Sequence, residues 1–380
     1  IESYLPEANA NSATPLALYE DYQRNTRQTI AANRGDLRAV FERLDDGPLI
    51  SVIVGEGDRE NHPLAQSIKS LQRQVYSNWE CLVCDWTASA GDERKSLIEK
   101  MSLSDERLRR VEVEDDGRQS RALRELFDLT KGTYILVMSP GDRLSEDALL
   151  EMVLALKEKQ CRVVYFDEDV VEADALHGGH YRDPKFKPDF DYDFLLASNY
   201  IGTAFLFEKA VLESVGGGRD EFPAAQLLDA LLRMVEAIPA GEVLHIARVL
   251  YHRFEPVRHH GAREADGSAV IDCVNAHLER SSSGGRAEPH IDPFGKSRAG
   301  CCRIIWPLSS PAPKVSIIVP TRDRADLLEH CLQSVLQSQG HYPTKFEIIV
   351  VDNDSCEPRT AEVLRRFVAP DNVRVLPFRG

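Results

Sequence analysis

The carboxylates best suited to chemistry stand where apolar runs of the sequence end. The run 134–138 leads into the turn 139-SPGD-142, which places the carboxylate of Asp142 just before an expected helix start. Two further apolar runs end in the same way, one in Asp85 and the other in Asp352 followed by Asn353. Because ligands bind beyond the carboxyl ends of strands in open α/β sheets, these side chains are candidates for a binding edge.

Carboxylates at such an edge could hold a metal ion or act as acid and base. Hard cations such as Mg²⁺ and Mn²⁺ take carboxylate oxygens, but Asp142 is a single carboxylate at its turn. A denser group, 167-DED-169, follows the strand-like run 162–166 and could bind a metal or supply the paired carboxylates of a glycoside hydrolase. The plainer interpretation, which we favour, is a solvated turn after that strand.

Cysteine and histidine spacing does not favour a metal centre. Cys81 and Cys84 have the spacing of a zinc or redox pair, but both lie in one strand-like run, where residues three apart point to opposite faces. The eight cysteines are expected to be reduced thiols, as in cytosolic proteins. His245 and His252 flank another strand-like run, and structural or surface roles are expected for both.

Length and charge limit the class of protein. The chain has 380 residues and a net charge of −15. The length predicts two domains, with three as the alternative. The charge argues against a nucleic-acid partner, because phosphate backbones are bound by Lys and Arg. No apolar run approaches the roughly 18–20 residues that span a bilayer. The chain begins at Ile1 rather than Met and ends after a strand-like run, so we interpret it as a fragment.

A repeated unit organises the predicted strands. The run 48–54 resembles 314–320, and each is followed by an amphipathic helix. Each helix leads to a second apolar strand that ends in aspartate, at 79–85 and at 346–352. Another helix and a third strand complete a β-α-β-α-β unit in both copies. Nearly continuous apolar strands separated by helices predict an α/β fold, with a mostly parallel sheet that is covered on both faces.

The remaining segments set the predicted domain boundaries. Residues 16–46 have the spacing of amphipathic helices and are expected to pack on the first domain. The Gly-, Ser- and Arg-rich stretches 259–270 and 281–300 are expected to be loop or linker on either side of a helix. The predicted parts are an N-terminal helical segment (1–47), a first domain (48–258), a helix-containing linker (259–312) and the N-terminal half of a second domain (313–380).

The second repeat resembles the opening of a family 2 glycosyltransferase. The stretch 314-KVSIIVPTRDRADLLEHCLQSVL-336, followed by 346-FEIIVVDNDS-355, has that family's strand, Pro-Thr, helix, and strand ending in Val-Asp-Asn. The chain as a whole is similar to tandem two-domain members of bacterial surface-polysaccharide synthesis, through 165-YFDED-169, 186-FKPD-189 and 199-NYI-201. The resemblance implies the Rossmann-like nucleotide-diphosphosugar transferase fold called GT-A in the first domain and in the partial second copy.

The resemblance also implies site residues. Nucleotide-sugar-binding positions correspond to Thr321, Arg322, Asp352 and Asn353 in the second domain and to Asp85 in the first. The family binds Mg²⁺ or Mn²⁺ through an Asp-x-Asp that neutralises the donor diphosphate, and it uses a carboxylate base to take the acceptor proton. Of the metal motif in the first domain only the trailing Asp142 remains, and it is the metal-ligand candidate.

The first domain departs from the family pattern at three places. Ser139 and Gly141 replace the two Asp-x-Asp carboxylates, and Leu227 stands at the position of the base. Glu56 replaces the threonine of the nucleotide turn after the first strand, and Trp86 follows Asp85. We therefore expect a non-catalytic first domain with no assigned catalytic residue. The fragment is expected to be inactive, because the metal and base carboxylates of the second domain would lie beyond Gly380.

The parent protein is expected to transfer a sugar, with inversion, from a UDP- or dTDP-sugar to a growing cell-surface polysaccharide. The implied acceptor is a glycan or lipid-linked glycan. The implied location is the cytoplasm, peripheral at the inner face of the membrane, where the protein could associate with membrane-bound synthesis machinery. One alternative is a non-catalytic glycan-binding or scaffold module. A nucleotidyltransferase would need a Gly-rich phosphate loop, and 55-GEGDRE-60 matches one poorly.

Overall fold

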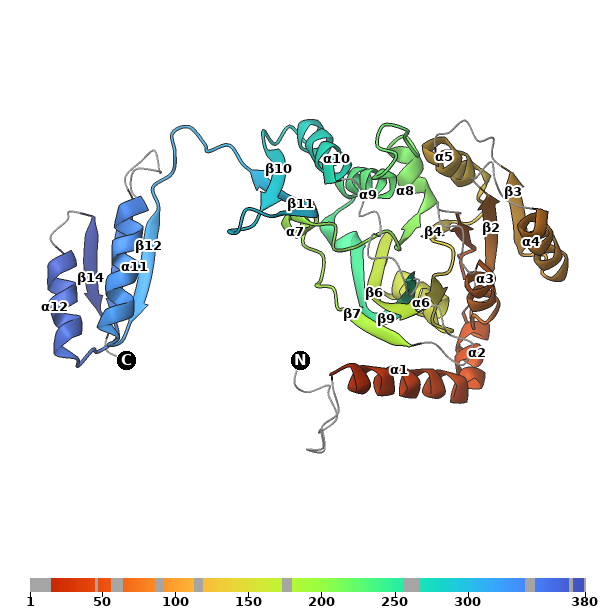
Figure 1. The fold of residues 1–380 in the computed structure, drawn as a ribbon, viewed down its shortest axis with the longest axis horizontal. Helices are drawn as coiled ribbons and strands as arrows, with labels where there is room; N and C mark the ends of the chain where they lie inside the picture. Colours follow the sequence, from red (N-terminus) through yellow and green to blue (C-terminus); the bar gives the residue numbers. More distant parts are fainter. Residues whose placement is uncertain are drawn as a thin grey trace. The chain divides into compact units, whose positions relative to one another are not determined.

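The computed structural model describes residues 15–44, 47–55, 64–85, 92–112, 119–172, 180–255, 267–338, 346–368 and 372–378. The chain divides into two compact units, Ile1–Ile305 and Trp306–Gly380, which are described separately below (Figure 1). Within the described residues, no helix is long and apolar enough to cross a membrane.

One large sheet forms the centre of the first unit. Its described strands are β1 (Ile50–Val54), β2 (Trp79–Asp85), β3 (Leu108–Glu112), β4 (Tyr134–Met138), β5 (Arg143–Leu144), β6 (Val163–Glu172), β7 (Tyr181–Lys185), β8 (Leu206–Glu208) and β9 (Val243–Glu255). The strand order is β3-β2-β1-β4-β8-β6-β9-β5, with β7 paired to β6. Strands β1 to β4 are parallel to one another and β6 is parallel to β9, whereas the short β8 runs antiparallel between β4 and β6. The predicted α/β class with a mostly parallel sheet is confirmed.

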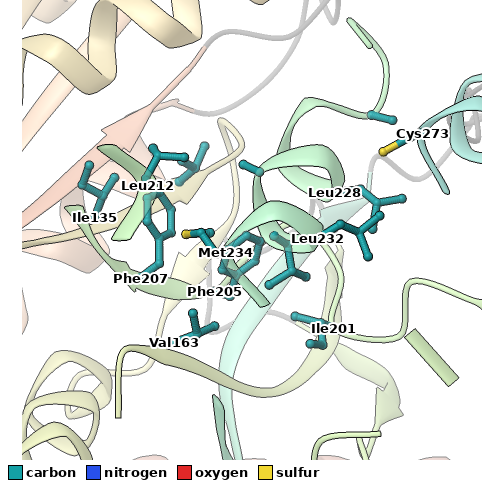
Figure 2. Packing of buried hydrophobic residues seen from close by; sticks show 14 of the residues in the cluster. Ile135, Val163, Ile201, Phe205, Phe207, Leu212, Leu228, Leu232, Met234 and Cys273 are labelled. Atoms are coloured by element: carbon teal, nitrogen blue, oxygen red, sulfur yellow. The ribbon is translucent and has the colours of Figure 1, made fainter. Parts of the chain in front are cut away.

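Helices cover both faces of this sheet, which explains why the strand sequences are apolar without alternation. All five residues of β1 are buried. One face packs against α3 (Leu64–Gln72), α4 (Asp92–Ser104) and α6 (Ala148–Lys159). The other face packs against α5 (Gln119–Leu129), α7 (Tyr192–Ala197), α8 (Lys209–Ser214), α9 (Gln226–Ala237) and α10 (Gly267–Arg280). Figure 2 shows Leu232 of α9 between Phe205 and Leu228 in this second core.

The N-terminal residues form two helices, α1 (Pro15–Ala32) and α2 (Arg34–Glu42). Leu37, Phe41 and Leu44 pack against the core on the α3 and α6 face, whereas α1 lies along β7. The predicted packing of this segment on the first domain is therefore observed.

The segment predicted as a linker contributes to the first unit. Residues 281–300 were expected to be loop or linker, and this expectation is wrong, because β10 (Arg286–Ile291) and β11 (Ser297–Ile305) form an antiparallel hairpin. The side chain of Asn275 in α10 accepts a bond from the Ala287 amide at 2.7 Å and donates to its carbonyl at 3.1 Å. Since α10 also buries Val274 in the core, the compact unit extends to Ile305 and not to residue 258.

The second unit repeats the opening of the first. A parallel sheet of β12 (Ser316–Thr321), β13 (Glu347–Asp352) and β14 (Val373–Pro377) is joined by α11 (Ala325–Gln337) and α12 (Pro358–Phe367). The repeat extends to side chains. The Ser316 hydroxyl donates to Glu347 at 2.7 Å, as Ser51 does to Glu80 at 2.7 Å in the first unit.

Candidate functional site

The carboxyl ends of the first unit's parallel strands meet at one edge of the sheet. Val54 lies in register with Val83 of β2 and with Met138 of β4, and the Gly55 amide donates to the Met138 carbonyl at 3.4 Å. Asp85 lies at this edge in register with Glu112. The segments 56–63, 86–91 and 113–118, which include Glu56 and Trp86, and the side chain of Asp85 lie outside the described residues.

The turn after β4 is held in place by buried hydrogen bonds. Gly141 has a φ of +93°, and a Cβ there would lie 2.8 Å from the Phe254 ring, so glycine is required. The Gly141 amide donates to Ser67 Oγ at 2.8 Å. The Asp142 carboxyl accepts bonds from the Tyr251 hydroxyl and from the Phe254 amide, the latter at 2.7 Å. Asp142 thus ties the turn to β9.

Burial dominates the chemistry of Asp142. Its exposed fraction is 4%, and this burial raises the pKa of the carboxyl to about 7, although the bonds from Tyr251 and Phe254 oppose the rise. Both oxygens are directed to groups of β9 rather than to solvent. The geometry gives Asp142 a structural role rather than that of a metal ligand.

The group 167-DED-169 is not the solvated turn that the sequence analysis favoured. It lies within β6, and the exposed fractions of its three residues are 3%, 8% and 1%. Strand β6 continues past the acids because Val170 and Val171 pair with the long strand β9. These two valines after the acids were the sequence signal that the strand does not end at residue 166.

Each of these acids has a buried partner from another element. Asp167 Oδ1 lies 2.8 Å from His245 Nε2, and Asp169 Oδ1 lies 2.6 Å from His252 Nδ1. Of the structural or surface roles expected for the two histidines, the geometry supports the structural one. Asp169 Oδ2 also accepts from Tyr19 and Gln23 of α1, at 2.7 and 2.9 Å, so the N-terminal helix contacts this cluster directly.

Glu168 forms a buried ion pair with Lys187 and contacts Lys185. Its oxygens lie 3.1 Å from Lys187 Nζ and 3.3 Å from Lys185 Nζ, and Lys187 also donates to the Ile201 carbonyl at 2.7 Å. Burial by itself would raise the pKa of Glu168, but the two lysines outweigh it and lower the pKa. Glu168 is therefore ionised, and the positive charge of Lys187 balances its negative charge.

The acidic cluster lies at the same edge as the turn after β4. Strand β8 places Leu136 of β4 level with Val164 of β6, through Leu206. Three residues farther along each strand come Ser139 and Asp167. This edge, where strand order changes at β8, is where a ligand would bind in an open α/β sheet.

The residues present at this edge do not fit the metal that the family resemblance implies. Ser139 and Gly141 have no carboxylate, and both oxygens of Asp142 accept hydrogen bonds from the protein. Across the part of the chain that the structure describes, no group of three or more His, Cys, Asp or Glu side chains is placed to hold a metal ion.

The position of the expected base is apolar in structure as well as in sequence. Leu227 lies in the first turn of α9 and packs against the core. The nearby Asp229 is buried and accepts from Arg233 Nε at 2.9 Å, an ion pair that holds α9 rather than an accessible base.

The second unit brings together the strand-end residues that the sequence singled out. Thr321 and Asp352 are neighbours in register at the ends of β12 and β13, and the Asn353 amide donates to the Thr321 carbonyl at 2.8 Å. Arg322 and Asn353 are exposed.

Asp323, which is not among the site residues expected from the sequence, fixes this edge. It has a positive φ of 56°, and its carboxylate accepts from the Cys356 and Glu357 amides, both at 2.7 Å, at the start of α12. In return Glu357 accepts from the Ala325 amide of α11 at 3.2 Å. The two helix starts therefore cap each other beside the strand ends.

Comparison with known proteins identifies the family. The family described as Glycosyl transferase family 2 matches residues 58–216 and 316–380. A Sinorhizobium fredii protein named "Uncharacterized protein y4gI" is 33% identical over 94% of this chain and 39% of its own length. The "O-antigen biosynthesis protein RfbC" of Myxococcus xanthus is 33% identical over 88% of this chain and 25% of its length. The chain thus spans well under half of each relative.

Solved structures give a weaker likeness. The structure of S. aureus TarS 1–349 in complex with UDP-GlcNAc has a TM-score of 0.48 and 13% identity, over 60% of this chain and 66% of that chain.

The family match covers more than half of the chain, in both units. The chain therefore belongs to glycosyl transferase family 2, and the α/β sheet of its first unit is the GT-A fold of that family.

Proposed function

We propose that the protein to which this chain belongs transfers a sugar from a nucleotide donor, a UDP- or dTDP-sugar, to a growing cell-surface polysaccharide. Inversion at the anomeric carbon is part of the proposal. Membership of the transferase family supports it, as does the similarity to a relative whose name refers to O-antigen biosynthesis. The acceptor would be a glycan or a lipid-linked glycan, at the cytoplasmic side of a membrane and beside the synthesis machinery that the membrane holds.

The first unit is proposed to do no metal-dependent chemistry. The observation that carries this is the turn 139–142, where the Asp-x-Asp carboxylates are absent and Asp142 accepts hydrogen bonds from β9 through both of its oxygens. A diphosphate leaving group needs a compensating positive charge, and this turn offers no carboxylate ligand to hold a cation. The partly buried Leu227, which packs against the core at the base position, supports the same conclusion.

The second unit is proposed to bind the nucleotide. Asp352 and Asn353 offer hydrogen-bond acceptors to a base or ribose at the strand edge, and the exposed Arg322 can pair with a phosphate. The divalent ion that the family resemblance implies, Mg²⁺ or Mn²⁺, is the proposed cofactor of the protein to which this chain belongs. Asp85 keeps the equivalent strand-end position in the first unit and is the residue through which that unit would bind a nucleotide weakly.

Calorimetric titration of UDP and dTDP into the 380-residue chain, with and without Mn²⁺, tests both assignments. We expect binding that is weakened by Arg322→Ala or Asp352→Asn and unchanged by Arg359→Ala, an exposed arginine on α12. Binding should also be unchanged by Asp142→Asn. Mn²⁺-dependent binding that Asp142→Asn abolishes would place a metal site in the first unit and overturn its non-catalytic assignment. The absence of binding by both nucleotides would overturn the assignment of the second unit.

A scaffold or glycan-binding role for the first unit is the second candidate. The carboxylates at its ligand edge are engaged with histidine, lysine and α1 side chains, which stabilises a fixed surface rather than a reactive one. This role is compatible with sugar transfer by the second domain of the same protein.

A further inference from the structure

A layered stack of aromatic rings rises from the sheet of the first unit and ends at an exposed ring. Tyr165 of β6 lies under Tyr200, with ring centroids 5.9 Å apart and planes at 79°. Tyr200 in turn stacks on Phe194 of α7, with centroids 4.7 Å apart and planes only 7° from parallel. Tyr200 is half-buried, whereas the exposed fraction of Phe194 is 43%. One face of the Phe194 ring is thus covered by Tyr200, and the residue still has a large exposed area.

Hydrogen bonds fix each layer of this stack. The Tyr165 hydroxyl donates to the Pro188 carbonyl at 2.7 Å, and the Tyr200 hydroxyl accepts from the Asp191 amide at 2.8 Å. The Asp191 carboxylate caps α7 by accepting from the Phe194 amide at 2.8 Å. Beneath Tyr165 lies the ring of His245, with centroids 5.0 Å apart, and His245 is held by Asp167. The exposed ring is therefore attached to the rigid sheet through a chain of fixed groups.

The segment that carries the stack also presents carboxylates to solvent. The side chain of Asp189 is fully exposed, at 102%, and its Oδ1 lies 3.7 Å from His245 Nδ1. Asp193 is exposed as well. Phe186, on the same segment, has an exposed fraction of 69%. These residues combine a flat apolar surface with hydrogen-bond acceptors.

We propose that the exposed ring of Phe194, together with the exposed carboxylate of Asp189 on the same segment, binds a pyranose unit of the acceptor glycan. The C–H groups on one face of a pyranose ring form an apolar patch that packs on an aromatic ring, while its hydroxyls donate to carboxylates. The inference deepens the proposed function and rests on it, because it takes the acceptor to be a glycan. It assigns Phe194 and Asp189 a binding role and no catalytic role.

Charge distinguishes this ligand from the other occupants that an exposed ring could have. Asp189, Asp191 and Asp193 lie within five residues of Phe194 in the sequence, and all three are exposed. A second copy of the chain would bring the same negative charges to the contact, and nucleotides or anionic lipids would be repelled. A neutral glycan brings hydroxyl donors and no charge, and it suits this surface.

The test is ligand-observed NMR on the 380-residue chain with cellohexaose, mannohexaose and chitohexaose as probes. At least one probe is expected to bind. Phe194→Ala should weaken its binding about tenfold, because the stacking surface is lost, and Asp189→Asn about threefold, because one charged acceptor is lost. Phe194→Trp, which keeps a flat ring, should preserve binding. The matched control is Phe294→Ala, which removes an exposed aromatic ring, 87% exposed, from the β10–β11 turn of the same unit.

Three outcomes would overturn the proposal. The first is that no probe binds the wild type, and the second is that Phe194→Ala and Phe294→Ala lose glycan binding equally. The third is a change of oligomeric state in Phe194→Ala, measured by sedimentation, which would mean that the ring is a contact between copies. Thermal unfolding checks that each variant is folded. UDP titration of the same samples separates the two proposals. Lost glycan binding with intact UDP binding refutes the Phe194 site alone, whereas lost UDP binding with intact glycan binding refutes the donor assignment alone.

Discussion

The buried carboxyl of Asp142 makes a prediction that links the degenerate turn to the stability of the first unit. Burial raises its pKa to about 7 from an ordinary value of 3.8. Because the folded pKa is the higher one, the native state binds more protons than the unfolded state between these values. The stability that Asp142 contributes is therefore complete below about pH 4 and is lost as the pH rises through about 7.

The size of the effect follows from the two pKa values. Between about pH 5 and pH 8 the carboxyl passes from mostly protonated to ionised in the folded state, while it is ionised throughout in the unfolded state. Linkage then gives a loss of about 2.5 kcal/mol in the free energy of unfolding. Asp142→Asn has no such titration, and its amide can still accept from Phe254 and donate to the Tyr251 oxygen. We expect the asparagine variant to gain about 2.5 kcal/mol relative to the wild type over this range.

The assay is urea unfolding of both proteins at several pH values, followed by tryptophan fluorescence. Trp79 is buried in the first unit, with an exposed fraction of 2%, and a Trp306→Phe background removes the signal of the second unit. The difference between wild type and variant cancels the titration of every other group. Parallel stability profiles would refute a carboxyl that is neutral below pH 7. If the free energy of unfolding of the variant instead falls relative to that of the wild type as the pH rises, the bonds from Tyr251 and Phe254 outweigh burial. Asp142 would then be ionised in the folded state.

Three further predictions concern the same edge of the sheet. Lys187→Met leaves Glu168 buried without its main partner and should lower the free energy of unfolding by about 3 kcal/mol. A Glu168→Gln, Lys187→Met double variant should recover much of that loss in thermal unfolding. Additive losses in the two single variants would contradict the pairing. Gly141→Ala places a Cβ 2.8 Å from the Phe254 ring at a φ of +93° and should lower the free energy of unfolding by about 2 kcal/mol or more. Gly295→Ala, where φ is also positive but the space is open, should lower it by about 1 kcal/mol. Equal losses in urea unfolding would show that Phe254 moves aside. Tyr19→Phe removes one hydrogen bond from α1 to Asp169 and should make amide hydrogen exchange in α1 roughly fivefold faster, while the exchange rate in α9 stays unchanged. Unchanged exchange in α1 would mean that Gln23 and apolar packing suffice to hold the helix.

The sequence by itself determined the repeated α/β organisation of this chain. A parallel strand that is covered on both faces is a continuous apolar run, and a run that ends in a polar turn marks the carboxyl edge without any knowledge of its neighbours. The strands ending in Asp85, Met138 and Asp352 were predictable for that reason. The loss of the Asp-x-Asp carboxylates at Ser139 and Gly141 was also readable from sequence, because it is a change of residue type at a fixed position.

Only the tertiary structure decided what the remaining charged residues do. The partners of Asp167 and Asp169 could not be predicted, because the two histidines come from β9, 78 and 83 positions later. The hairpin at 286–305 was likewise hidden, because its strands carry few apolar residues in sequence and pack against α10 and the core. Local pattern fixes elements that bury their own apolar residues, whereas buried ion pairs and edge hairpins depend on partners that only the folded chain brings together.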